Sequence, residues 1–174
     1  PFIIDSFFEC RKKPLKIYAL RENIDTLQKY LFNWSVSPNF AEIRNTNNEV
    51  SLELIPIEYG QKIKINGIEI TVIKANHTVP TCGFIIKKHG QAFLFSGDTY
   101  LNSELIELLN NDKSISSLLI DVSLNSKEED LAYESKHLTP KLLQQMLSSL
   151  KRDDVTIYTY HQKPLHTKKI DNEL

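Results

Sequence analysis

The chain has 174 residues, and its 21 basic and 22 acidic side chains give a formal net charge of −1. This length suits about one domain, and a composition of 41% hydrophobic and 25% charged residues excludes long disorder, collagen-like repeats and coiled coil. No apolar run reaches the ~18 residues of a membrane-spanning helix, and the near-neutral charge gives no global attraction to polynucleotide phosphates. The cysteines, Cys10 and Cys82, provide neither a disulfide framework nor a zinc-finger spacing.

The two ends of the chain have the character of cuts through a longer sequence. The chain starts at Pro1 without an initiator methionine and finishes at Leu174 within a predicted helix. We therefore expect an excerpt, in which the absence of a signal peptide carries no information.

The first third of the chain predicts short helices and strands around a polar loop. Apolar residues predict a helix at 1–9, a short strand at 16–20, and a helix with apolar residues at helical spacing at 21–33. A polar run predicts a loop at 35–49, and alternation predicts a strand at 51–57.

Two hairpins follow, and then strands and helices alternate. Asn66-Gly67 predicts a two-residue turn, and His89-Gly90 predicts a second hairpin. Thr139 is suited to cap a helix that begins with Pro140, and the charged run 127–130 predicts a solvated loop. The predicted elements are strands at 61–65, 68–74, 83–88 and 92–95, a helix at 101–110, a strand at 116–122, a helix at 139–151 and a strand at 155–160. This order predicts one α/β layered domain with helices packed on sheet.

Polar side chains that suit catalysis or metal binding stand where predicted strands end. His77, Asp98 and His161 each follow a strand, Asp121 lies near the end of another, and His137 comes just before a predicted helix. Loops held by a rigid sheet are where functional groups collect. Two histidines and a carboxylate suit Zn, Mn or Fe, and such a metal makes bound water a nucleophile at neutral pH. His137 would then act as a general acid toward a leaving oxygen.

Each of these residues also has a structural interpretation. A histidine after a strand is commonly only hydrogen-bonded, and an aspartate after Ser96-Gly97 is commonly a turn residue. Asp121 can serve as a buried hydrogen-bond acceptor, and His137 as a simple polar residue ahead of a helix. Outside this set, His89 is predicted at a hairpin tip and His166 is predicted to face solvent.

Taken together, the polar segments are more specific, because their order resembles that of the metallo-β-lactamase superfamily. The similarity is closest to its class II cyclic-nucleotide phosphodiesterases and extends in order over residues 1–174. The segments that carry it are Asn76-His-Thr-Val-Pro-Thr81, Phe95-Ser-Gly-Asp-Thr99, Asp121-Val-Ser123, Lys136-His-Leu-Thr-Pro140 and Tyr160-His-Gln-Lys-Pro164.

The resemblance implies an αββα sandwich, truncated at its N-terminal side, with a two-metal site at the edge between its sheets. By analogy, His77 would bind one metal, His161 would bind the other, and Asp98 would bridge both. The implied ions are two divalent cations, zinc first, with manganese or iron as alternatives.

The resemblance also implies tasks for neighbouring residues. His137 would handle the scissile phosphate or the leaving oxygen, so that His137 and Asp98 are the implied catalytic residues. Asp121 and Thr99 would orient the metal-binding side chains without contacting the metal themselves. Thr78 and Thr139 would contact the substrate.

The sequence departs from the family pattern in two places. The His-x-His-x-Asp-His signature is absent, and we expect it just ahead of Pro1, so that the excerpt alone would hold metal weakly or not at all and be inactive. Lys136 stands where the family tends to have glycine, which brings a cation near the site or turns the chain differently.

The implied function is hydrolysis of 3′,5′-cyclic nucleotides such as cyclic AMP or cyclic GMP to nucleoside 5′-monophosphates, through a hydroxide activated by two metal ions. The expected partner is a small cyclic nucleotide rather than a polynucleotide or a membrane, and a homodimer is left open. Composition suggests Phe32, Trp34 or Phe40 as a stacking platform for the base. The alternatives are another hydrolase of this fold, such as a tRNA 3′-processing endonuclease, and a non-catalytic scaffold or binding domain.

Overall fold

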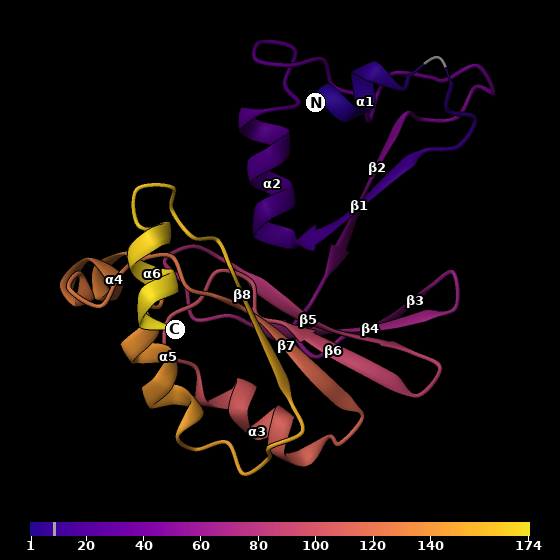
Figure 1. Cartoon of the computed structure of the whole chain (residues 1–174). Coiled ribbons are helices and arrows are strands. Elements are labelled where there is room, and N and C mark those ends of the chain that lie inside the picture. Colours follow the sequence, from indigo (N-terminus) through magenta and orange to yellow (C-terminus); the bar gives the residue numbers. More distant parts are fainter. Residues whose placement is uncertain (9) are drawn as a thin grey trace. The chain divides into compact units, whose positions relative to one another are not determined.

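The computed structural model describes residues 1–8 and 10–174, which form two compact units, Pro1–Glu58 and Tyr59–Leu174. Each unit is built from both helices and strands (Figure 1). All of the predicted catalytic and metal-binding residues lie in the second unit, whereas the aromatic residues suggested for base stacking lie in the first.

The first unit contains a parallel pair of strands and two helices. Its elements are α1 (Phe2–Ser6), β1 (Leu15–Leu20), α2 (Arg21–Tyr30) and β2 (Leu52–Ile57). Strands β1 and β2 pair from Leu15–Leu52 to Leu20–Ile57. A small core contains Ile4, Phe32, Phe40 and Leu52. The predicted elements are confirmed with shifted ends, and Glu9 of the first predicted helix lies outside the described residues.

The second unit is organised around a six-stranded sheet in the order β3-β4-β5-β6-β7-β8 (Figure 1). The pairs β3–β4, β4–β5 and β5–β6 are antiparallel, whereas the pairs β6–β7 and β7–β8 are parallel. The strands are β3 (Lys62–Ile65), β4 (Ile68–Lys74), β5 (Cys82–Lys88), β6 (Gln91–Phe95), β7 (Ile115–Asp121) and β8 (Thr156–Tyr160).

Both predicted hairpin turns are confirmed. Ile65 pairs with Ile68 around Asn66-Gly67, and Lys88 pairs with Gln91 around His89-Gly90. All four turn residues have φ between 50° and 80°. Two successive positive φ values match the right-handed twist of the strands, which is why Asn-Gly pairs favour such turns.

Four helices accompany the sheet, namely α3 (Ser103–Asn111), α4 (Glu129–Ser135), α5 (Pro140–Leu147) and α6 (Thr167–Glu173). Apolar residues of α3, α5 and α6 share one buried core with β6 and β7. The side chains of Asn102 and Thr139 cap α3 and α5 by accepting from Glu104 N and Leu142 N. The loop predicted at 127–130 is wrong in its second half, because Glu129 and Asp130 form the first turn of α4.

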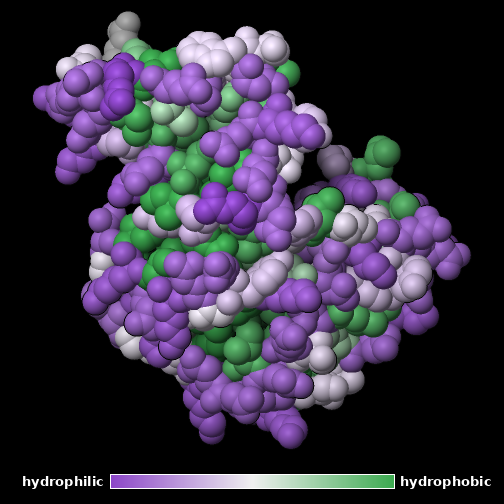
Figure 2. Space-filling model, turned by 180° about the vertical axis from the view of Figure 1, so that it is seen from behind, coloured by the Kyte–Doolittle hydropathy of each residue, from purple (hydrophilic) through white to green (hydrophobic). Residues whose placement is uncertain are grey.

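Within the described residues, no helix is long and apolar enough to cross a membrane. Hydrophilic side chains dominate the face seen in Figure 2, with hydrophobic patches between them. Cys10 and Cys82 are both free thiols.

The parallel strands β6, β7 and β8 position most of the candidate site. Their carboxyl ends lie at the same edge of the sheet, because parallel neighbours run in one direction. Asp98 comes just after β6, Asp121 ends β7 and His161 follows β8 directly. The fold therefore gathers these side chains from distant parts of the sequence.

Candidate metal centre

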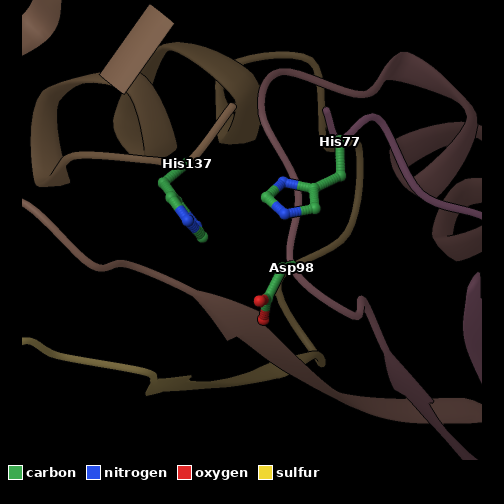
Figure 3. Close-up of side chains that lie close together, drawn as sticks. All are labelled: His77, Asp98 and His137. Atoms are coloured by element: carbon green, nitrogen blue, oxygen red, sulfur yellow. The ribbon is translucent and has the colours of Figure 1, made fainter. Parts of the chain in front are cut away.

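Five of the predicted site residues converge at this edge of the sheet. Ligand atoms of His77, Asp98 and His137 lie within 4.8 Å of one another, and so do those of Asp121, His137 and His161. Figure 3 shows the imidazoles of His77 and His137 and the carboxylate of Asp98 facing a common space. The imidazole centroids form a row, with 5.0 Å from His77 to His137 and 5.1 Å from His137 to His161.

Gly97 sets the position of Asp98. Its φ is +65°, and a Cβ at this residue would lie 2.6 Å from the carbonyl oxygen of Cys82. Only glycine allows this close approach without a shift of the backbone. The Ser-Gly-Asp order is therefore required by the turn that carries the carboxylate off the end of β6.

His77 is oriented by the backbone of a distant segment. Its Nδ1 lies 3.1 Å from the carbonyl oxygen of Lys136. Because a carbonyl oxygen only accepts, Nδ1 carries the hydrogen and Nε2 keeps its lone pair for a ligand. Lys136 presents this carbonyl from a left-handed conformation (φ 56°, ψ 50°) at the end of α4.

His137 forms a buried pair with Asp121. Its Nδ1 lies 2.6 Å from Asp121 Oδ2, and the Asp121 side chain is fully buried. The same oxygen accepts from Thr99 N at 3.1 Å. Thr99 is also fully buried and accepts from Asn76 N through Oγ1. Asp121 thus contacts the ring of His137, and Thr99 contacts the backbone of Asn76, the residue before His77. Their supporting role toward metal ligands stays a prediction.

Ser123 connects the same carboxylate to the third histidine. Its buried Oγ lies 2.5 Å from Asp121 Oδ1, 3.0 Å from His161 Nδ1 and 3.4 Å from His137 Nδ1. A hydroxyl has one hydrogen, and the shortest contact assigns it to Asp121. Ser123 then accepts from His161 Nδ1, so that His161 also keeps Nε2 for a ligand.

Tyr160 adds a phenol beside Asp98. Its Oη donates to Asp98 Oδ1 at 3.5 Å, and its ring packs against Phe95 with 5.1 Å between centroids. Burial raises the pKa of the Tyr160 phenol, and the nearby carboxylates of Asp98 and Asp121 add to this effect. The phenol therefore remains a hydrogen-bond donor to Asp98 at neutral pH.

These donors fit a divalent metal ion. Neutral imidazoles and a carboxylate are ligands for Zn, Mn and Fe. In all three histidines Nδ1 faces an oxygen acceptor, which is the arrangement that orients metal-binding histidines. The structure brings His77, Asp98, His137 and His161 together, and the division of these residues into ligands and acid stays a prediction.

The predicted substrate contacts differ in exposure. Thr78 is exposed beside His77. Thr139 is fully buried, and its hydroxyl caps α5 by accepting from Leu142 N. This buried hydroxyl has no solvent-exposed surface in the structure, and a substrate contact of Thr139 stays a prediction.

Other polar and aromatic predictions need correction. His166 does not simply face solvent, because its side chain is 18% exposed and its Nδ1 lies 2.8 Å from Glu128 Oε2. Phe32 and Phe40 are buried and unsuitable for stacking a base, whereas Trp34 is 60% exposed.

Sequence reasoning gave no role to two residues of the site. Ser123 stands in a segment that was noted for its order, but a serine carries no chemical signal that separates it from a loop serine. Tyr160 is the last residue of β8, where alternation would place its ring away from that of His161. His161 has φ +67°, which ends the alternation, and the two rings lie nearly parallel with 6.1 Å between centroids.

The fold and the site define the class of protein to which the chain belongs. Residues 11–159 match the family described as the beta-lactamase superfamily domain, and the chain is a member of this family. Among curated proteins, the comparison found no match.

Solved structures are similar over nearly the whole chain. Unliganded yeast PDE1 superimposes with a TM-score of 0.81 and 20% identity, covering 99% of this chain and 57% of that chain. The metallo-beta-lactamase fold protein YhfI from Bacillus subtilis gives 0.69 and 14%, covering 98% and 63%. The short form of human tRNase Z gives 0.57 and 12%, covering 88% and 68%. These similarities show the metallo-β-lactamase fold, and the chain spans less than two thirds of the first two structures.

Proposed function

We propose that the protein is a metal-dependent phosphodiesterase that hydrolyses 3′,5′-cyclic nucleotides to nucleoside 5′-monophosphates. The observation that carries this proposal is the convergence of His77, Asp98 and His137, whose ligand atoms lie within 4.8 Å of one another. These residues come from separate segments of the chain, and each has an orienting partner around it. Side chains that converge and are each oriented by a neighbouring group are typical of catalytic or metal-binding sites.

His77, Asp98 and His161 would hold divalent ions, with zinc as the first choice. Bound ions supply Lewis-acid stabilisation of the charge on a phosphate group and of the attacking water. Tyr160 donates to Asp98 and steadies its carboxylate. Ser123 and Lys136 fix the rings of His161 and His77 through their Nδ1 atoms.

His137 would deliver a proton to the departing ribose oxygen. Its Nδ1–H is held by Asp121, which leaves Nε2 toward the space shared with His77 and Asp98. The contact between His137 Nδ1 and Asp121 Oδ2, at 2.6 Å, holds the ring in this orientation. The Asp121–His137 pair thus resembles the acid that phosphodiester cleavage requires.

Two further observations favour a small cyclic nucleotide over a polynucleotide. The similarity to yeast PDE1 has a higher TM-score than the similarity to human tRNase Z. The net charge of −1 also gives no global attraction to a polyanion.

The experiment is a turnover assay of the full-length protein with cyclic AMP and cyclic GMP, with added Zn²⁺ or Mn²⁺ and with chelator. We expect hydrolysis only with metal. His161→Ala should lose at least about a hundredfold in kcat/KM, whereas His89→Ala, at an exposed hairpin tip, is the matched control. The absence of metal-dependent hydrolysis of either nucleotide would refute the proposal.

The same assay examines the acid role of His137. His137→Gln should lower turnover of the cyclic nucleotide by about 10²-fold or more. It should affect bis(4-nitrophenyl) phosphate far less, because nitrophenolate leaves without a proton. An equal loss on both substrates would exclude His137 as the proton donor.

A further inference from the structure

The side chain of Lys136, the residue before His137, lies against two aromatic rings. Its Nζ lies 3.9 Å from the ring centroid of Tyr133 and 5.1 Å from that of Tyr100. The two tyrosine rings contact each other edge to face with 5.9 Å between centroids. The attraction of an ammonium to ring faces restrains the lysine in one place.

The ammonium of Lys136 has no carboxylate partner among the described residues. Lys16 and Lys141, by contrast, pair with Glu53 and Glu129 at 3.5 and 2.7 Å. Lys136 as a whole residue is half-buried. A restrained cation without a carboxylate partner is favourable for binding an anion.

All three residues of this cluster are attached to the segments that form the site. Lys136 precedes His137 directly, and its carbonyl oxygen accepts from His77 Nδ1. Tyr100 is two residues after Asp98, and its backbone N donates to Asn76 O next to His77. The cation is therefore fixed to the same backbone as the candidate metal ligands.

The backbone conformation of Lys136 favours glycine rather than lysine. The residue ends α4 in the left-handed region, at φ 56° and ψ 50°. Glycine is the residue that adopts this helix-ending conformation at the least steric cost. The carbonyl contact to His77 needs only the backbone, so it does not account for a lysine side chain at this position.

We propose that Lys136, held by Tyr133 and Tyr100, is a binding site for the phosphate of the nucleotide substrate beside the metal centre. This inference rests on the proposed function and extends it by assigning the selection of anionic over neutral substrates to one residue. The ammonium pairs with a phosphate oxygen that does not face the metal. The tyrosines are positioning residues that hold the ammonium in reach.

The test compares binding of 5′-AMP and uncharged adenosine to full-length protein in chelator, by calorimetry or NMR titration, so that no turnover is needed. Wild type and Lys136→Arg should bind 5′-AMP about tenfold more tightly than adenosine. In Lys136→Gly, which keeps the backbone carbonyl, this preference should disappear while adenosine binding and the melting temperature are maintained. Tyr133→Phe should behave as wild type, and Tyr133→Leu should show a reduced preference.

Three results would overturn the proposal: an unchanged preference in Lys136→Gly, no preference in wild type, or no binding of either probe to wild type. A lower melting temperature of Lys136→Gly with an unchanged preference would show that the lysine only secures the end of α4. Because the readout is binding without metal, it is independent of whether cyclic nucleotides are hydrolysed. A protein that fails the turnover assay can still show the phosphate preference of Lys136.

Discussion

At the scale of single residues, one hydroxyl accounts for much of the order in the site. Ser123 Oγ contacts Asp121, His161 and His137, and the side chains of Ser123 and Asp121 are fully buried. By donating to the carboxylate and accepting from His161, it sets the tautomer of that ring. A buried carboxylate without enough donors is costly, so this serine also protects the fold.

Replacing Ser123 should therefore weaken both stability and metal binding. Ser123→Ala leaves Asp121 Oδ1 without its closest donor, which should cost about 1–3 kcal/mol in the free energy of unfolding. With His161 no longer fixed, metal affinity should fall about 10–100-fold. Urea unfolding and metal titration measure the two effects, and Ser148→Ala on the exposed end of α5 is the matched control. Unchanged metal affinity would limit Ser123 to a structural role.

At the scale of elements, the sequence predicted those parts whose signals are local. The hairpins at Asn66-Gly67 and His89-Gly90 depend on turn chemistry alone, and so does the cap at Thr139. The site residues could be recognised at the ends of predicted strands, because a polar side chain directly after a buried strand is unusual. Helix α4 was missed because seven residues are too few for periodicity, and its burial rests on Ala132 packing into the core.

The turn between α3 and β7 provides a pH-dependent contribution to stability. The Ser114 hydroxyl donates to Asp112 Oδ1 at 2.6 Å, and this hydrogen bond holds the pKa of Asp112 below its usual value. A lowered folded-state pKa stabilises the protein above the unfolded pKa, and the contribution is lost as pH falls through the folded value.

Asp112→Asn should accordingly be less stable than wild type at neutral pH, by about 0.5–1 kcal/mol. The difference should shrink as pH falls through the lowered folded-state pKa of Asp112, because the wild-type carboxylate then takes up a proton. Unfolding free energies measured across this range test the expectation, with the exposed Asp153→Asn as control. A difference that does not change with pH would mean that the charge of Asp112 has no part in it.

At the scale of the whole molecule, family membership follows from the order of segments rather than from any one motif. The match covers residues 11–159 and ends two residues before His161. The contacts of Lys136 with His77 and of Ser123 with three site residues could not be predicted, because they arise only when distant segments of the chain meet. That residues 1–174 act as one domain stays a proposal, since they form two compact units.

Net charge leads to a prediction about substrate size. A polynucleotide substrate contacts several phosphates, so between 50 and 200 mM salt its binding weakens by about 10³-fold or more for six to ten contacts. A mononucleotide with one phosphate near Lys136 loses one screened interaction, which amounts to a few-fold change at most. We therefore expect KM for the cyclic nucleotide to change little over this range in metal-loaded full-length protein. Measured in parallel, a tRNA precursor that is cleaved with a lower KM and a steep salt dependence would instead support an RNA-processing enzyme.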